Sequence, residues 1–252
     1  MQKNTCLEVC TDSDASAMAA VRGGADRLEL CTCLLAGGLT PDPVLLEQIR
    51  RKSNIAIRCL MRPRFGDFLY TEPEIELMEE QIRRLKDAGA DGFVIGCLTP
   101  EGDLDTAQMK RLIAAAGGLP VTLHRAFDVS RDGMETASAA ADLGIDTILT
   151  SGQAQSCWEG REFIGKLLDE KLPLTIMAGA GVNADVIRKM KEILPLSVFH
   201  MSGKKTLESG MTFRREGVPM GLPGINEFTI WQTDESAVKA AAAVLKGEDA
   251  SC

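Results

Sequence analysis

A short pattern recurs three times along the chain: a glycine, one further residue and an aspartate, followed by a strand-like run. The three segments are Gly23–Leu28, Ala88–Phe93 and Leu143–Ile148. Their aligned glycines lie 65 and 55 residues apart, about twice the roughly 30 residues of one strand–helix unit. Every second unit therefore carries the pattern, and a chain of 252 residues holds about eight such units.

Short apolar runs that are typical of strands alternate with amphipathic runs that are typical of helices. The expected strands are Leu7–Cys10, Leu28–Cys31, Ile55–Met61, Gly92–Ile95, Val121–His124, Thr147–Leu149, Leu174–Met177 and Val198–His200. The expected helices are Ala15–Val21, Val44–Ile49, Pro73–Leu85, Ala107–Ala115, Glu135–Ala141, Glu162–Leu168, Val186–Ile193 and Ser236–Leu245. This alternation predicts the α/β fold class, with a TIM (β/α)8 barrel as the architecture. No linker or low-complexity stretch divides the chain, so residues 1–252 are expected to form a single domain.

The composition argues against two classes of partner. A formal net charge of −8 opposes binding to nucleic acid and to anionic membranes. No run approaches the roughly 20 apolar residues of a membrane span, and no basic segment precedes an apolar run at Met1–Asp12. The eight cysteines are therefore expected to be free thiols in the reducing cytoplasm. None forms a Cys-x-x-Cys pair, so a structural zinc site is not expected.

The first two predicted strands each carry a carboxylate and a thiol on one face. Successive strand residues point to opposite faces, so Glu8 shares a face with Cys10, and Glu29 with Cys31. The alternate positions are apolar and suit the helix layer of a barrel: Leu7, Val9, Leu28 and Leu30. We therefore expect the two carboxylates and the two thiols to point toward the barrel interior.

The same alternation places basic side chains inside the barrel. On the third strand, Arg58 and Arg62 point inward if their apolar neighbours face the helices. On the fifth strand His124 points inward, and His200 ends the eighth strand. Both histidines of the chain thus fall at the C-terminal ends of predicted strands, where barrel enzymes hold their active sites.

Two interpretations of these inward charges are open. In the first, Glu8 and Glu29 form structural ion pairs with Arg58 or Arg62, and the histidines are hydrogen-bonded core residues. In the second, the charged groups belong to a functional site. We favour the second interpretation, because burying charge is expensive and aliphatic side chains would fill a barrel at lower cost.

Cys10 and Cys31 lie on adjacent predicted strands, whose backbones run about 4.8 Å apart in a parallel sheet. Thiolates at that separation can bridge a soft cation such as Cu(I). The alternative is that both are small buried hydrophobic residues, as free cysteines often are. Spacing alone does not choose between these interpretations.

A run of small residues, Met177–Asn183, follows the seventh predicted strand. Gly179 and Gly181 would let backbone N–H groups approach an anion, and the next helix adds the positive end of its dipole. Barrels often bind phosphate at the loops after strands seven and eight, and Ser202 with Gly203 supplies the second loop. The alternative is a tight strand–helix turn without a ligand.

The segment Gly203–Thr233 separates the last predicted strand from the last predicted helix. At about 30 residues it is long for a plain connection. We expect it to serve as a lid or as a contact between subunits.

Seven sequence segments, spread over nearly the whole chain, resemble those of one known family. They are Glu8–Cys10, Gly24–Cys31, Gly37–Pro41, Met61–Phe68, His124–Asp128, Leu149–Gly152 and Met177–Gly181. Together they resemble the CutC copper homeostasis family. Two positions depart from the family pattern. Phe65–Gly66 stands where the family usually has two glycines, and His200–Ser202 occupies a variable position.

The resemblance implies a TIM barrel, a cytoplasmic setting, assembly into a homo-oligomer and a link to copper handling. The thiols proposed to bind Cu(I) in this family match Cys10 and Cys31 of this sequence. The first hypothesis is therefore a cytoplasmic copper homeostasis protein that binds Cu(I) through these two inward-facing thiols at the barrel mouth.

The second hypothesis is an enzyme that acts on a small phosphorylated or carboxylated metabolite. Its general base would be Glu8 or Glu29, its acid His124 or His200, and its anion clamps Arg62 and Arg125. A third hypothesis is a structural module that self-assembles through Gly203–Thr233. The sequence names neither a substrate nor a reaction, and it leaves open whether the protein is catalytic.

Overall fold

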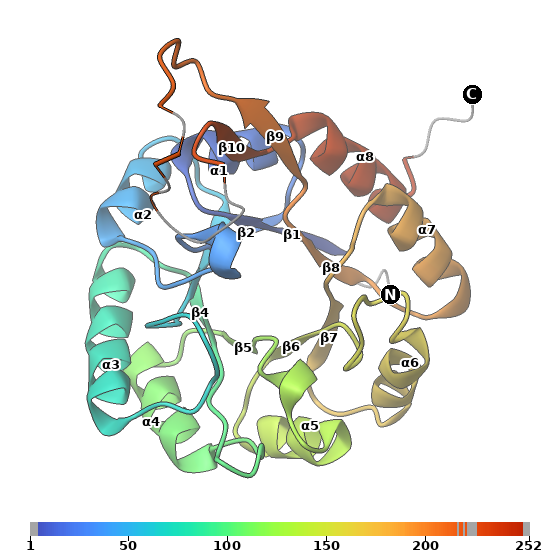
Figure 1. Cartoon of the computed structure of the whole chain (residues 1–252). Coiled ribbons are helices and arrows are strands. Elements are labelled where there is room, and N and C mark those ends of the chain that lie inside the picture. The colour runs from blue at the N-terminus through green and yellow to red at the C-terminus, as the bar shows by residue number, and fades with distance from the viewer. Residues whose placement is uncertain (1–4, 216, 219, 221–225, 249–252) are drawn as a thin grey trace.

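The computed structural model describes residues 5–215, 217–218, 220 and 226–248. Eight parallel strands close into a barrel in which each strand pairs with the next and β8 pairs with β1 (Figure 1). Their bounds are β1 (Cys6–Thr11), β2 (Arg27–Leu30), β3 (Ala56–Leu60), β4 (Gly92–Ile95), β5 (Val121–Leu123), β6 (Thr147–Thr150), β7 (Thr175–Ala178) and β8 (Val198–Met201).

Helices surround the barrel and alternate with its strands (Figure 1). Their bounds are α1 (Asp14–Arg22), α2 (Pro43–Arg50), α3 (Glu72–Asp87), α4 (Thr106–Ala116), α5 (Gly133–Asp142), α6 (Arg161–Asp169), α7 (Ala184–Ile193) and α8 (Glu235–Lys246). Two short 3₁₀ helices, η1 (Leu34–Ala36) and η2 (Phe127–Val129), lie in the loops after β2 and β5. The predicted TIM barrel is confirmed, and most element bounds differ from the predicted ones by one or two residues.

The helix starts are set by capping side chains, which accept hydrogen bonds from backbone N–H groups that have no partner inside the helix. Ser13 accepts from the Ser16 N–H ahead of α1, and Asn183 accepts from the Val186 N–H ahead of α7. The aspartates that cap in the same way are Asp42, Asp105, Asp132 and Asp234. These caps are local in sequence, which is why most helix positions could be predicted from sequence alone.

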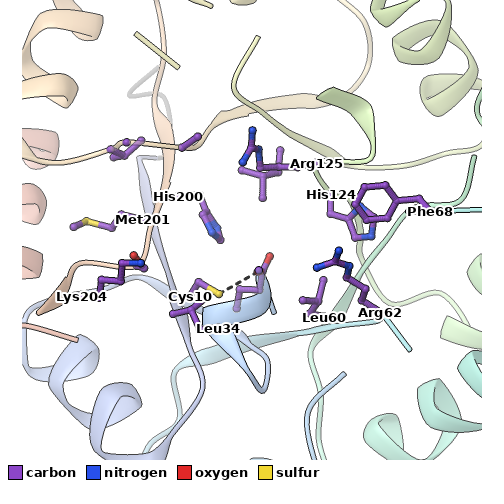
Figure 2. A pocket seen from close by; sticks show the side chains of 17 residues that line it. Cys10, Leu34, Leu60, Arg62, Phe68, His124, Arg125, His200, Met201 and Lys204 are labelled. Atoms are coloured by element: carbon purple, nitrogen blue, oxygen red, sulfur yellow. Dashed lines mark hydrogen bonds between the residues drawn. The ribbon is translucent and has the colours of Figure 1, made fainter. Parts of the chain in front are cut away.

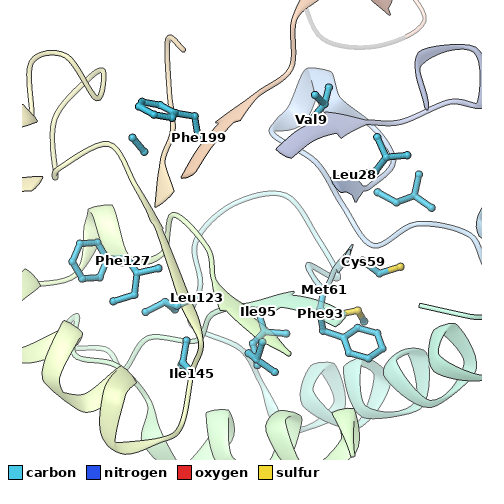
Figure 3. Close-up of a cluster of buried hydrophobic side chains, with 14 of the residues drawn as sticks. Val9, Leu28, Cys59, Met61, Phe93, Ile95, Leu123, Phe127, Ile145 and Phe199 are labelled. Atoms are coloured by element: carbon cyan, nitrogen blue, oxygen red, sulfur yellow. The ribbon is translucent and has the colours of Figure 1, made fainter. Parts of the chain in front are cut away.

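The main hydrophobic core lies between the strands and the helices. Leu7, Val9 and Leu28 belong to this layer, as the strand alternation predicts, and Figure 3 shows part of it. A separate small cluster inside the barrel contains Cys10 and Cys31, packed with Leu60 and Val94. The strand alternation therefore divides apolar side chains facing the helices from thiols and carboxylates facing the interior.

The segment between β8 and α8 contains an antiparallel hairpin that the sequence analysis did not predict. It pairs β9 (Lys204–Glu208) with β10 (Thr229–Thr233), and its base is closed by the Asp234 N–H donating to the Gly203 carbonyl. Part of the predicted lid or subunit contact, residues 216, 219 and 221–225, lies outside the described residues. That role, the homo-oligomer and the single-domain organisation stay predictions.

The described cysteines are all free, in agreement with the prediction of free thiols. Among the described residues, no helix has both the length and the apolar character needed to cross a membrane.

Candidate functional site

A cavity of about 440 Å³ opens at the C-terminal ends of the barrel strands (Figure 2). Its wall includes eight of the residues that the sequence singled out: Cys10, Glu29, Arg62, His124, Arg125, Gly181, His200 and Ser202. Four of the predicted site residues do not line it: Glu8, Cys31, Gly179 and Gly203. The fold therefore brings most of the predicted site residues to the cavity wall and places the other four outside that wall.

Glu8 is withdrawn because it forms a buried ion cluster behind the cavity wall. The side chain is fully buried, with one carboxylate oxygen 2.9 Å from His200 Nδ1 and the other bonded to Arg27 Nε. Burial alone would raise the pKa of Glu8, but the His200 hydrogen bond and the Arg27 charge outweigh it and lower the pKa to about 2. Glu8 is thus a permanent carboxylate that orients His200, and both of its oxygens are engaged.

The structural interpretation of the inward carboxylates named the wrong arginines. Arg58 donates instead to Asp146, with Nη2 2.7 Å from the carboxylate, and to the Thr122 hydroxyl. The partner of Glu8 is Arg27, which faces it directly in the β1–β2 register. Arg27 shares the strand face of Glu29, so the same alternation that was applied to Glu29 could have identified it.

Cys10, Glu29 and His200 form a compact cluster on one side of the cavity. The Cys10 thiol donates to Glu29 Oε1 at 3.3 Å, the dashed line in Figure 2. One potential ligand atom from each of the three residues lies within 4.8 Å of the others. Cys31 stands just behind, with its Sγ 3.6 Å from the Cys10 Sγ. Cysteine sulfur, carboxylate oxygen and imidazole nitrogen are common metal ligands, so this cluster can hold a metal ion.

The cluster carries several protons at neutral pH. The hydrogen bond with Cys31, burial and the nearby Glu29 charge all raise the pKa of Cys10 well above its usual value. Burial alone would lower the pKa of His200, but the charge of Glu29 and the bonds to Cys10 and Glu8 raise it well above its usual value. A metal ion binding here must therefore displace at least the Cys10 proton.

One carboxylate oxygen of Glu29 has no hydrogen-bond partner among the described residues. Burial and the neighbouring Glu8 charge raise its pKa, while His200 opposes that rise. Its Oε1 accepts from Cys10, whereas its Oε2 is buried without a hydrogen-bond partner in the described part of the chain. An unpartnered buried carboxylate oxygen is costly, and a ligand that donates to it removes the cost.

His124 stands across the cavity as a neutral imidazole. Its Nδ1 accepts a hydrogen bond from the Ala126 N–H at 3.1 Å, so the ring proton resides on Nε2. Burial, together with the charge of Arg62, lowers the pKa of His124 to about 3. The ring can lie here because position 96 is glycine: a Cβ at Gly96 would stand 2.5 Å from His124 Cε1. Gly96 was not predicted from the sequence, because its role depends on a neighbour from the next strand.

Arg62 is anchored by the backbone of the neighbouring loops. Its Nη1 donates to the carbonyls of Ala36 and Gly38, at 3.1 and 3.2 Å, and its Nη2 donates to the Gly66 carbonyl at 2.8 Å. The guanidinium carbon lies 5.2 Å from the centre of the Phe68 ring. Phe68 was not predicted as a site residue, because it lies in an irregular loop where strand alternation gives no direction.

The small-residue loop after β7 divides into a packing glycine and a cavity-lining turn. A Cβ at Gly179 would stand 2.5 Å from Leu149 Cδ1, so that glycine serves packing. Ala180 and Gly181 follow with φ of 70° and 78°, and both line the cavity. Gly203 also has a positive φ of 53°, but it packs against Met201 and Val238 beside the cavity. Of this loop, Ala180, Gly181 and Val182 line the cavity, and Gly179 does not.

Arg125, the other predicted anion clamp, is half-exposed at the cavity rim. Its Nε donates to Asp128 Oδ2 at 2.7 Å, and its Nη2 donates to the Ser151 hydroxyl at 3.2 Å. Asp128 therefore balances much of the Arg125 charge, which leaves Arg62 as the better placed buried cation.

The comparisons with known proteins agree on one family. The model of the CutC family matches residues 5–205. The copper homeostasis protein cutC homolog of Homo sapiens is 40% identical over 242 residues, which are 95% of this chain and 89% of the human protein. A family protein CutC of Vibrio campbellii is 41% identical over 93% of this chain and 96% of its own length. The crystal structure of CutC from Streptococcus agalactiae has a TM-score of 0.75 and 28% identity, covering 79% of this chain and 98% of that chain. On these grounds the chain is a member of the CutC family.

Proposed function

We propose that this protein binds Cu(I) between Cys10 and Cys31 and serves copper homeostasis in the cytoplasm. The observation that carries the proposal is the approach of two inward-facing thiols to 3.6 Å, with Cys10 in the cavity wall and Cys31 buried just behind it. Thiolates are the soft ligands that select Cu(I) over harder divalent ions. The copper homeostasis name of the human relative supports the same assignment.

The donor set fits a Cu(I) ion with more than two ligands. With metal–sulfur bonds of about 2.3 Å, a sulfur separation of 3.6 Å corresponds to an angle of about 105° at the metal. That angle leaves room for a further ligand, and Glu29 and His200 are the side chains that can supply one. A linear two-coordinate ion would require the distance between the two sulfurs to increase by about 1 Å.

The test is a Cu(I) titration of the full chain in competition with a chromogenic chelator. Replacing both thiols, in Cys10→Ser/Cys31→Ser, is expected to weaken Cu(I) binding at least roughly 100-fold, because hydroxyl groups are poor ligands for a soft ion. Cys59→Ala is the matched control, since Cys59 is buried in the outer core away from the cavity. Equal Cu(I) affinity of the double variant and the control would reject the proposal.

The second candidate function is catalysis on a small carboxylated or phosphorylated metabolite. The cavity favours it, because about 440 Å³ exceeds what one metal ion needs and falls within the range of small-molecule sites. Glu29 and His124 both line this cavity, and each has a buried side-chain atom without a hydrogen-bond partner among the described residues. In this function Glu29 is the general base, and the protonated His200 is the acid.

The catalytic candidate can be tested without knowing the substrate. Wild-type protein is incubated in D₂O with a panel of small hydroxy acids, oxo acids and their phosphates, and loss of C–H signals is followed by NMR. We expect exchange with at least one compound and its loss in Glu29→Gln, because the amide cannot accept the proton. Exchange that persists in Glu29→Gln, or none with any compound, would count against this function.

A further inference from the structure

We propose that the cavity wall formed by His124 and Arg62 binds the carboxylate group of a small organic acid. The inference deepens the second candidate function and rests on the cavity being a ligand site. It concerns the side of the cavity that lies opposite Cys10 and His200, as Figure 2 shows.

The first donor of this subsite is the Nε2–H group of His124. Its position follows from the hydrogen bond at the other nitrogen, where Nδ1 accepts from the Ala126 N–H at 3.1 Å. The His124 side chain is only 5% exposed and lines the cavity. Its Nε2 has no hydrogen-bond partner among the described residues. A buried N–H of this kind is stabilised by any ligand that brings an acceptor.

The second donor is the Nε–H group of Arg62. Both terminal nitrogens of this guanidinium are engaged by loop carbonyls, which hold the group in one place. The Nε is buried and lacks a hydrogen-bond partner anywhere in the described chain. The three carbonyls carry no formal charge, so the positive charge of Arg62 is left for the ligand to balance.

The two donors belong to one wall because both side chains contact the same aromatic ring. The centres of the His124 and Phe68 rings lie 4.8 Å apart. The guanidinium carbon of Arg62 lies over the Phe68 ring, 5.2 Å from its centre. Figure 2 shows the three side chains together. Phe68 thus bounds the subsite with an apolar surface and limits the water that competes for the donors.

The number of donors and the charge select a carboxylate. Two free N–H groups and one uncompensated positive charge match a monoanion with two acceptor oxygens. A phosphate presents three acceptor oxygens and up to two negative charges, more than this wall supplies. A metal cation is excluded here, because both groups are donors and one is positively charged. A carboxylate bound at this wall directs the rest of the molecule across the cavity, toward Glu29, which also lines it.

The subsite can be tested by NMR on the ¹⁵N-labelled full chain at pH 7. The chain has two histidines, so the His124 ring signals are assigned by their loss in His124→Asn. Acetate is expected to shift the Nε2–H proton downfield in a saturable manner. Inorganic phosphate at the same ionic strength is expected to produce a much smaller shift. Absence of a saturable acetate shift would overturn the proposal, and so would a phosphate response equal to that of acetate.

Three variants sharpen the test, with acetate affinity read from saturation transfer to its methyl protons. His124→Asn keeps an acceptor for the Ala126 N–H but is too short to place a donor at the Nε2 position, and should weaken binding roughly 10- to 100-fold. His124→Gln can place its amide at the Nε2 position and should recover part of the loss. Arg131→Gln is the control, because it removes a positive charge that is paired with Asp103 at the surface. Wild-type affinity in His124→Asn would overturn the proposal.

The binding test separates the subsite from the proposed functions. Acetate binding without turnover of any compound would keep the subsite and count only against the catalytic candidate. The Cu(I) titration reports on Cys10 and Cys31, whichever result the acetate experiment gives.

Discussion

Replacing His124 by asparagine is expected to change how the stability of the protein responds to acid. In the folded protein the pKa of His124 is lowered to about 3 from an ordinary value of 6.5, by burial and by the charge of Arg62. Between these two pH values the unfolded chain binds a proton that the folded protein does not accept. Stability from the neutral imidazole is therefore complete above pH 6.5 and is lost as the pH falls toward 3.

The magnitude follows from the two pKa values. One pKa unit corresponds to about 1.4 kcal/mol, so between pH 7 and pH 4.5 the His124 contribution falls by about 2.5 kcal/mol. Asparagine does not titrate in this range, and its side-chain oxygen can still accept from the Ala126 N–H. The wild type should therefore lose about 2.5 kcal/mol more than His124→Asn over this interval, whatever the other titrating groups contribute to both.

Urea unfolding at pH 7 and pH 4.5, followed by circular dichroism, measures this difference directly. For each protein, the change in unfolding free energy between the two pH values is determined, and the change in the wild type is then compared with that in the variant. Equal acid sensitivity within about 0.5 kcal/mol would refute the reasoning. It would mean that His124 titrates as an exposed histidine does, and that it is not a buried neutral imidazole in the cavity wall.

Three other changes test the rest of the site. Glu8→Gln removes the buried carboxylate that is bonded to both Arg27 and His200, and should lower the unfolding free energy at pH 7 by about 3 kcal/mol; a loss below about 1 kcal/mol would contradict the ion cluster. Gly96→Ala places a Cβ 2.5 Å from His124 Cε1, so thermal or urea unfolding should show a loss of about 1–3 kcal/mol, and an unchanged stability would argue against the tight seat. Cu(I) affinity should rise at least about tenfold per pH unit between pH 6 and 8, because binding displaces the raised-pKa proton of Cys10; a flat chelator-competition profile would oppose thiolate ligation.

Local periodicity was enough to predict the barrel and the direction of its first two strands. The apolar positions Leu7 and Val9 face the helices, and Cys10 and Cys31 pack together inside, as a period of two requires. Such patterns depend only on the order of neighbouring residues, so they can be recognised without knowing the rest of the fold. Alternation gave no direction after the strands end, which is why Phe68 was missed.

The choice of partners among the inward groups was decided by the closed barrel. Glu8 and His200 are 192 residues apart, and they meet only because β1 pairs with β8 in the register that places these two residues side by side. The register of β1 with β2 sets Arg27 opposite Glu8, while Arg58 donates to Asp146. A sequence names the charges that enter the interior, but strand register determines which of them neutralise one another.

The state of each buried group is likewise a tertiary property. The sequence alone determined that His124 would stand at the end of an inward-facing strand. Its tautomer and depressed pKa depend on the Ala126 backbone, the space left by Gly96 and the nearby Arg62. The physical reason is that strand direction follows from one residue's neighbours in the chain. Desolvation and hydrogen bonding instead depend on every group that the fold packs around a side chain.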